Sequence, residues 1–265
     1  MSEAKQPEAP VLVADHGAVR VITVNRPDKL NALNAATLDA LAVAFQAADD
    51  DGAVRCVVLT GAGQKAFVAG ADIAEMNTLT PVQGRDFSLR GQRLMRLVET
   101  LSKPVVAMVN GFALGGGLEL AMCCHLRIAG DNARLGQPEV NLGLIPGFGG
   151  TQRLLRLAGR AATLELCLLG APVDAQRARE LGIVNRVVPA GELEAETMKI
   201  AGQLAGSAPL ALRGVLDCVN FGGECGIEEG LQYETTQFGL MFSTGDMREG
   251  TAAFLERRKP AFQGR

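Results

Sequence analysis

The first half of the chain alternates short apolar runs with turns. Val11–Ala14 and Val19–Val24 are two such runs, and their spacing predicts a β-hairpin. From Asn34 onward, apolar residues recur at helical spacing until a run of aspartates ends the predicted helix. The next run, Cys56–Thr60, predicts a buried strand that leads into a pair of glycines.

The strand-then-glycine pattern returns at Val105–Val109 and at Leu126–Ala129. Because strands alternate with helical segments, this order predicts an α/β fold rather than a β-sandwich. The character of the chain changes near Val188, beyond which no strand pattern remains. Four helices are expected there: Glu192–Ala205, Pro209–Phe221, Ile227–Phe242 and Asp246–Lys259. The last one follows Ser243, whose spacing to Asp246 is typical of a capping box.

These patterns divide the 265 residues into three expected parts. Residues 1–10 form a polar tail, residues 11–190 an α/β core, and residues 191–265 a helical C-terminal subdomain. The chain is 48% hydrophobic, which is ample material for one large core.

The charge balance excludes several classes of partner. Lys and Arg number 26 and Asp and Glu 29, for a net charge of −3. Such a chain has no general attraction to nucleic acid or to anionic membranes, so we expect neither as a partner. Its apolar runs are too short to span a bilayer, and its first residues lack an apolar signal segment. We therefore predict a cytoplasmic protein, or a matrix-like one from which a transit peptide has been removed.

Cysteine and histidine usage does not favour a metal site or a disulfide framework. The cysteines contain no CxxC pair, and the two histidines, His16 and His125, are far apart in the sequence. Most of the cysteines stand among apolar residues, so buried, reduced thiols are the favoured interpretation. They are Cys56, Cys123, Cys124, Cys167, Cys218 and Cys225.

A first glycine-rich turn, Gly115–Glu119, follows a predicted strand and is expected to open a helix. The first turn of a helix offers free N–H groups and the positive end of the helix dipole. Gly116 and Glu119 are three residues apart and therefore share a face, so an oxygen held by the Gly116 N–H would lie near the Glu119 carboxylate. Taken alone, the motif is equally compatible with glycines that serve only tight packing.

A second glycine-rich turn ends in Glu139. Pro138 lacks an N–H and stiffens the backbone, so Glu139 is expected on a stiff loop rather than on a helix. A loop glutamate is usually just solvated. Here, however, the glycines of Pro146–Gly150 form another turn with backbone donors before a helix that starts near Thr151.

A third segment, residues 67–73, is rich in small residues that could bring a backbone N–H to the same oxygen, or could simply end a strand. Two carboxylates beside exposed backbone N–H groups are what acid–base chemistry next to a developing oxyanion requires. The three segments together therefore favour such chemistry.

Other chemistries find less support. Gly61–Ala66 matches the dinucleotide-binding fingerprint only superficially, because no helix pattern follows it. No phosphate-binding loop and no nucleophile elbow are present. Paired glutamates also suggest a glycosidase, but a chain with no Trp and one Tyr offers few platforms for a sugar. The basic run 257–259 is either a solvated face or a contact with a phosphorylated ligand.

Taken together, the motifs resemble the crotonase family, and specifically its short-chain enoyl-CoA hydratases. The likeness runs in order from about Val11 to Lys259. The segments that carry it are Asn25–Pro27, Ala69–Ile73, Asn110–Glu119, Gly136–Glu139 and the stretch that continues to Arg153.

The resemblance implies an α/β fold built as a spiral of ββα units with a helical C-terminal subdomain used in trimerisation. It also implies a homo-oligomer, either a trimer or a hexamer made of two trimers. The implied partner is an acyl-CoA thioester substrate. No metal and no separate cofactor are expected, because coenzyme A is part of the substrate.

The resemblance also implies roles for individual residues. The N–H groups of Ala71 and Gly116 hold the thioester oxygen, Glu119 activates water for attack on C3, and Glu139 delivers a proton to C2. Gly147 is a backbone donor to that water. The residues implied in CoA binding are Ala69, Asp72, Ile73, Phe254 and Arg257, of which Phe254 and Arg257 are expected to reach the CoA of a neighbouring subunit.

The implied activity is hydration of short 2-trans-enoyl-CoA to 3-hydroxyacyl-CoA, with the reverse dehydration. A Δ3-Δ2-enoyl-CoA isomerase is the nearest rival, and retention of both acids favours the hydratase. An RNA-associated role is a rival from another class, which the negative charge disfavours. Two positions depart from the family pattern: Ala74 replaces a common lysine, and His125 a common aspartate.

Overall fold

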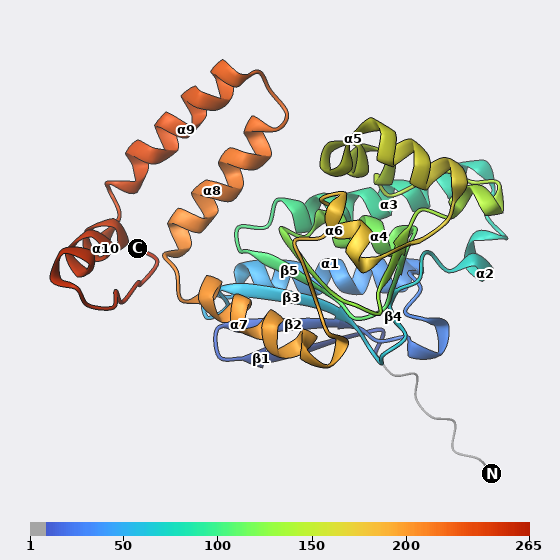
Figure 1. Cartoon of the computed structure of the whole chain (residues 1–265), viewed down its shortest axis with the longest axis horizontal. Coiled ribbons are helices and arrows are strands. Elements are labelled where there is room, and N and C mark those ends of the chain that lie inside the picture. The colour runs from blue at the N-terminus through green and yellow to red at the C-terminus, as the bar shows by residue number, and fades with distance from the viewer. Residues whose placement is uncertain (1–8) are drawn as a thin grey trace, which may run out of the picture.

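The computed structural model describes residues 9–265 (Figure 1). Most of the tail predicted over residues 1–10 therefore lies outside the described residues. A six-stranded sheet has the order β1-β2-β3-β5-β7-β10, and a four-stranded sheet the order β4-β6-β8-β9. The strands are β1 (Val11–His16), β2 (Val19–Val24), β3 (Cys56–Gly61), β4 (Ala66–Val68), β5 (Val105–Val109), β6 (Phe112–Leu114), β7 (Leu126–Gly130), β8 (Arg134–Gly136), β9 (Val173–Asp174) and β10 (Arg186–Val188).

Strand pairing confirms the predicted hairpin and α/β class. β1 and β2 are antiparallel, with Val11 opposite Val24. The other neighbours in the large sheet pair in parallel, which requires a crossover connection between them. The crossover helices are α1 (Ala35–Asp50), α2 (Ile73–Met76), α3 (Pro81–Glu99), α4 (Gly116–Cys123), α5 (Gly150–Leu169) and α6 (Ala175–Glu180).

The chain winds as a spiral of ββα units, as predicted. Each turn adds a strand to the large sheet, a strand to the small sheet and then a helix: β3, β4 and α3; β5, β6 and α4; β7, β8 and α5. Local chemistry sets where the helices begin. The Asn34 side chain accepts the Thr37 N–H at 2.9 Å and caps α1. Thr80 and Gln83 form a capping box at the start of α3, with Pro81 in its first turn.

The core lies on both faces of the large sheet because alternate strand residues point to opposite sides. Val57 and Val105 pack with the buried residues of α1, α3 and α4. Val58 and Val106 pack instead against α7 (Leu193–Ala205), which covers the other face (Figure 1). The 3₁₀ helix η1 (Pro27–Lys29) connects β2 to α1, and η3 (Ala190–Glu192) connects β10 to α7.

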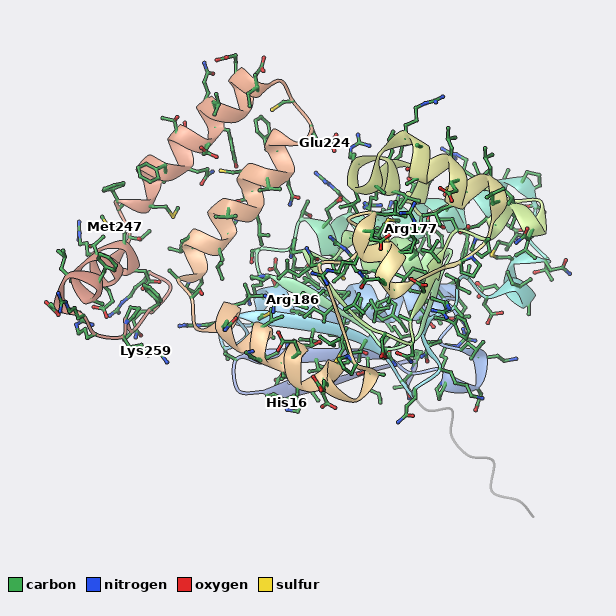
Figure 2. The ribbon with its side chains drawn as sticks, in the orientation of Figure 1. His16, Arg177, Arg186, Glu224, Met247 and Lys259 are labelled. Atoms are coloured by element: carbon green, nitrogen blue, oxygen red, sulfur yellow. The ribbon has the colours of Figure 1, made fainter. Side chains whose placement is uncertain are left out.

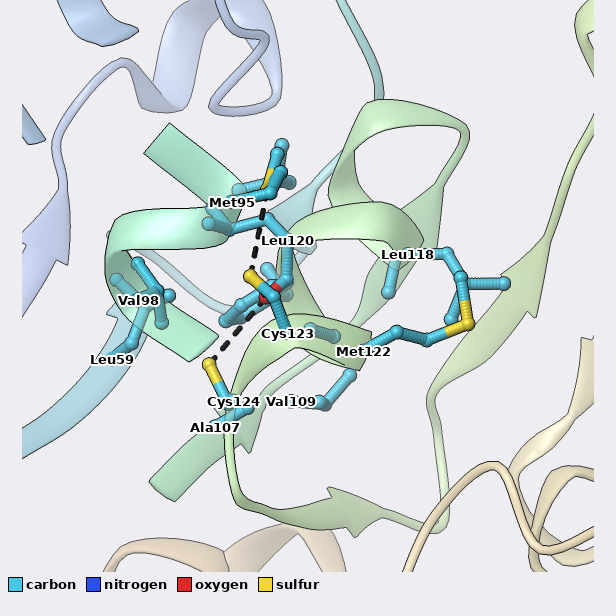
Figure 3. Packing of buried hydrophobic residues seen from close by; sticks show 14 of the residues in the cluster. Leu59, Met95, Val98, Ala107, Val109, Leu118, Leu120, Met122, Cys123 and Cys124 are labelled. Carbon is cyan, nitrogen blue, oxygen red and sulfur yellow. Dashed lines mark hydrogen bonds between the residues drawn. The ribbon is translucent and has the colours of Figure 1, made fainter. Parts of the chain in front are cut away.

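The thiols are free, as the sequence predicted. Figure 3 shows Cys123 and Cys124 among the packed side chains around Leu120. The Cys123 thiol donates to the Leu120 carbonyl at 3.0 Å, and burial raises its pKa. Cys218 and Cys225 are only partly buried, so the prediction of buried thiols is wrong for these two.

The predicted C-terminal helices are present as α7, α8 (Pro209–Gly222), α9 (Ile227–Met241) and α10 (Gly245–Glu256). Figure 1 shows α8 and α9 as a hairpin that stands away from the core, with α10 at the end opposite the turn, beside the start of α8. Because α7 packs on the sheet, the part of the chain that projects from the core begins at α8. The domain boundary at residue 190 stays a prediction, and so does the role of residues 191–265 in oligomerisation. The cap of α10 is Thr244, which accepts the Met247 N–H at 3.1 Å, and not Ser243.

Two polar contacts connect the projecting hairpin to the core. The Asn220 amide donates to the Glu99 carbonyl at 2.8 Å, and Arg156 pairs with Glu224 at 3.1 Å. Figure 2 labels Glu224 at the turn between α8 and α9. Within residues 9–265, none of the helices has the length and apolar character that crossing a membrane requires.

Candidate active site

A cavity of about 470 Å³ opens between α2, α3, the start of α4 and the loop over residues 138–148. Most of the predicted site residues meet there. Those that line the cavity are Ala69, Ala71, Ile73, Gly116, Glu119, Glu139 and Gly147. Its other walls are largely apolar and include Met76, Leu79, Phe87, Leu142 and Ile145. An apolar cavity with a few convergent polar groups is the usual form of a small-molecule site.

The three glycines at the start of α4 serve different purposes. Gly115 adopts φ +51°, and a Cβ atom placed on it would lie 2.7 Å from Oε1 of Glu139. A Cβ on Gly117 would overlap the Val68 carbonyl, so this glycine serves the packing of α4 on β4. The packing and the chemical interpretations of the motif therefore both apply, each to its own residue.

Two residues of the cavity wall, Ala71 and Gly116, have backbone N–H groups with no acceptor among residues 9–265. Gly116 is the first residue of α4, where the N–H has no partner within the helix. Leu33 accepts the Asp72 N–H and donates to the Gly70 carbonyl. The Ala71 N–H lies between these bonds and meets no acceptor in the described part of the chain. A Cβ on Gly116 would lie 3.6 Å from the Ala71 nitrogen. The N–H groups of Ala71 and Gly116 are therefore close together in the cavity wall.

Glu119 is almost completely buried, at 1% exposure. Its Oε1 accepts the Phe148 N–H at 2.7 Å and the Gly150 N–H at 2.6 Å. Burial raises the pKa of Glu119 to about 7; the charge of Glu139 adds to the rise, while the two N–H groups and Arg153 oppose it. The sequence indicated a donor turn at 146–150, but not that two of its N–H groups hold Glu119.

Glu139 begins the 3₁₀ helix η2 (Glu139–Leu142), so the prediction of a stiff, non-helical loop is wrong here. Pro138 occupies the N-cap position and ends the preceding extended segment. Burial raises the pKa of Glu139. Gln137 is fully buried, and in the orientation that satisfies its amide it donates to the two Glu139 oxygens at 2.9 and 3.1 Å. Sequence reasoning missed this partner.

Gly147 is held through its carbonyl by α3. Ser88 donates to it at 2.5 Å and Gln92 at 3.0 Å. The ring of Phe148 lies 5.3 Å from that of Phe87, and a Cβ on Gly91 would overlap it. Sequence reasoning missed this set on α3, where spacing at i, i+3 and i+4 was the available signal.

Three of the residues implied in CoA binding do not line the cavity of this chain. Asp72 caps α2 and pairs with Arg26 at 2.8 Å, beside the cavity rather than in its lining. Phe254, at 82% exposure, lies on α10 and Arg257 is the C-cap residue of this helix, at the opposite end of the molecule from α2 (Figure 1). Their contact with a neighbour's CoA stays a prediction.

The two departures from the family pattern are accommodated by local bonds. His125 accepts the Val105 N–H through Nδ1 at 2.8 Å, and its Nε2 lies 3.2 Å from the Glu99 carbonyl. Burial lowers the pKa of this histidine and keeps it neutral. The Ala74 N–H donates to Asp72 at 3.2 Å, so the backbone of this segment is fixed without a long side chain at position 74.

One buried and one partly buried carboxyl group beside two free backbone donors define an enzyme site that can move protons and stabilise an oxyanion. The chain belongs to the enoyl-CoA hydratase/isomerase family, which it matches over residues 14–265.

Two relatives and one solved structure illustrate this membership. The chain is 46% identical to a short-chain-enoyl-CoA hydratase of Clostridium acetobutylicum, over 94% of this chain and 95% of the relative. It is 46% identical to a crotonyl-CoA hydratase of Syntrophomonas wolfei, over 95% and 97%. The crystal structure of an enoyl-CoA hydratase from Bacillus anthracis superposes with a TM-score of 0.94 at 38% identity, covering 97% of this chain and 100% of that one.

Proposed function

We propose that this protein is an enoyl-CoA hydratase that adds water across the 2,3 double bond of short-chain 2-trans-enoyl-CoA and catalyses the reverse dehydration. The observation that carries the proposal is that Glu119 and Glu139 line the same cavity as the free N–H groups of Ala71 and Gly116. The names of the two relatives at 46% identity support the choice of a short acyl chain.

In the proposed reaction, the thioester oxygen accepts hydrogen bonds from Ala71 and Gly116. Attack of water on C3 moves the double-bond electrons toward that oxygen and builds an enolate there. Each preorganised donor of this kind contributes about 3 kcal/mol to transition-state stabilisation. The reaction therefore needs a carbonyl in conjugation with the double bond, as a 2-enoyl thioester provides.

The two glutamates divide the proton transfers. Ionised Glu119 takes a proton from the water as its oxygen bonds to C3, and protonated Glu139 gives a proton to C2 as the enolate collapses. Net charge is conserved, because one carboxylate becomes a carboxylic acid and the other the reverse. The Gly147 N–H is proposed to hold the water.

The proposal extends to CoA and to assembly. Ala69 and Ile73 lie at the cavity wall and suit contacts with the CoA portion. Asp72 would act there indirectly, by keeping α2 in place. Phe254 and Arg257 would reach the CoA of a neighbouring subunit in a trimer or a hexamer. Exposed apolar side chains on α9 and α10 support such an assembly.

The proposed reaction uses neither a metal nor a nicotinamide, because water and two carboxyl groups suffice. Chelator-treated protein without added cofactor is expected to retain its full rate. Loss of the rate on chelation would contradict this part of the proposal. The cytoplasmic location stays a prediction, which cell fractionation would test.

A spectrophotometric screen tests the assignment. We expect purified protein to remove the conjugated enoyl-thioester absorbance of 2-enoyl-CoA substrates, fastest for the four-carbon chain. An unchanged absorbance at every chain length would contradict the proposed function.

An isomerase activity is a second candidate, because Glu139 beside the same donors could move a proton between C2 and C4 of a 3-enoyl-CoA. It is expected as a slower side reaction that depends mainly on Glu139. A 3-enoyl-CoA converted faster than a 2-enoyl-CoA is hydrated would reverse this ranking.

A further inference from the structure

The turn over residues 147–150 holds Glu119 through two peptide groups, each fixed at its carbonyl end. The peptide that supplies the Phe148 N–H has the Gly147 carbonyl on its other side, bound by Ser88 and Gln92. The peptide that supplies the Gly150 N–H has the Gly149 carbonyl, which accepts N–H groups of the first turn of α5 at 3.1 and 3.0 Å.

The peptide group between these two joins Phe148 to Gly149, and one side chain, Arg153, holds it. Nη1 of Arg153 donates to the Phe148 carbonyl at 3.1 Å. Gly149 takes φ +102°, a conformation that glycine adopts readily, and its missing Cβ leaves room for the guanidinium.

Glu99 fixes Arg153 in turn. Nε and Nη2 of Arg153 donate to the two Glu99 oxygens, both at 3.1 Å, in a bidentate pair whose side chains are 15% and 24% exposed. Glu99 is the last residue of α3, and Arg96 also contacts it, at 3.0 Å. Burial opposes ionisation of Glu99, but the two guanidinium groups hold the pKa of this carboxyl below its usual range.

We propose that the Arg153–Glu99 pair positions Glu119 for proton transfer by fixing the Phe148–Gly150 turn. The inference rests on the proposed function, in which Glu119 is the base. Arg153 makes no hydrogen bond to Glu119 and acts through the turn, so it is a positioning residue rather than a catalytic one.

Arg153 also acts through its charge. The ionisable groups that bear on Glu119 are Glu139 from η2 and, from α5, Arg153 and the Cys167 thiol. Of these, Arg153 alone is positive and lowers the pKa of Glu119. Removal of this charge should therefore move the titration of Glu119 to higher pH, and with it the acidic limb of the pH–rate profile.

The test compares Arg153→Met with Arg156→Met in the full-length protein. Arg156 lies one turn further along α5, and its side chain is 50% exposed and pairs with Glu224. We expect Arg153→Met to lower kcat roughly 10- to 100-fold with KM changed less than about threefold, because the misplaced base affects chemistry more than binding. Arg156→Met should stay within about twofold of wild type in both constants.

A substrate-free readout separates this inference from the proposed function. Titration of the Glu119 carboxyl by ¹³C NMR, assigned with Glu119→Gln, should show a higher midpoint in Arg153→Met and no change in Arg156→Met. If wild type does not hydrate enoyl-CoA but this midpoint moves, the electrostatic effect of Arg153 on Glu119 holds and the proposed function fails.

Arg153→Lys covers the case in which Arg153→Met does not fold. Lysine keeps the charge but cannot form the bidentate pair, so kcat should fall while the Glu119 midpoint stays near the wild-type value. A folded variant at position 153 with kcat equal to that of Arg156→Met would overturn the inference. So would a lower melting temperature in Arg153→Met with neither kcat nor the midpoint changed.

Discussion

At the scale of single residues, the two glutamates differ in what holds them. Glu119 receives two backbone N–H groups on one oxygen, which favours its ionised form against the cost of burial. Both oxygens of Glu139 accept hydrogen bonds from the neutral carboxamide of Gln137, and burial raises the pKa of this carboxyl group. Burial raises the pKa of both carboxyl groups, to about 7 for Glu119, so their division into base and acid rests on the proposed function and not on these environments.

The raised pKa of Glu119 makes a prediction about stability. Because the pKa rises from 4.5 to about 7, the folded state binds more protons than the unfolded chain between these values. Stability from this group is greatest below pH 4.5 and falls as pH rises, by about 3 kcal/mol at pH 8. Glu119→Gln lacks this dependence.

Urea unfolding of wild type and Glu119→Gln at pH 5 and pH 8, at one protein concentration, measures this effect. The variant should gain stability relative to wild type at the higher pH. The shift that burial causes at Glu139 is common to both proteins and cancels in the comparison, whereas its coupling to Glu119 is part of the measured difference. A stability difference that is the same at both pH values would show that Glu119 titrates normally.

At the scale of elements, hydrophobic periodicity predicted the hairpin, the alternation of strands with helices and the four C-terminal helices. Val105–Val109 was predicted with the bounds that the structure has. The family resemblance supplied the roles of Glu119, Glu139 and Ala71. These roles could not come from periodicity, because the contacts that form the site join residues far apart in the sequence.

The contacts of the site that the sequence did not predict also join residues far apart in the sequence. Ser88 and Gly147 are 59 residues apart, and Glu99 and Arg153 are 54 apart. Neither pair leaves a local signal. The 3₁₀ turn at Glu139 was missed because Pro138 indicates the end of extended structure but does not determine the conformation of the next residues.

The face of α3 that borders the cavity offers a prediction about chain length. Pro81, Gly84, Phe87 and Ser88 share this face by their spacing and all line the cavity. A Cβ on Gly84 would meet nothing within 4 Å. Gly84→Leu should therefore fill part of the cavity and lower kcat/KM for longer enoyl chains by about 10-fold or more, with the four-carbon chain little affected.

Gly202→Leu on α7 is the matched control, because that position is exposed and also free of neighbours within 4 Å. Both variants gain helix propensity, so any common effect comes from stability. Equal chain-length profiles for the two variants would mean that position 84 does not face the acyl chain.

At the scale of the whole molecule, the C-terminal helices expose several large apolar side chains, which is uncommon for the surface of a monomer. Phe254 and Leu255 on α10 are 82% and 81% exposed, and Phe238 and Leu240 on α9 are 66% and 53% exposed. A second copy of the chain is the proposed cover for this surface.

Phe254→Asp tests the proposed assembly without disturbing the core, since this side chain has few contacts within the chain. We expect light scattering to give a trimer or a hexamer for wild type and a smaller species for the variant, together with weaker binding of a CoA thioester. Val43→Asp, at a position on α1 that is 70% exposed, is the control and should assemble normally. A monomeric wild type would contradict the shared-site proposal.

The most direct test of the two-carboxyl mechanism is the hydration rate of a four-carbon 2-enoyl-CoA with wild type, Glu119→Gln and Glu139→Gln. An amide keeps the shape of each side chain but cannot accept or deliver the proton. Each variant should therefore lose roughly 10²- to 10⁴-fold in kcat while it binds the thioester nearly as well as wild type. A variant of either glutamate that hydrates at close to the wild-type rate would contradict the two-carboxyl mechanism.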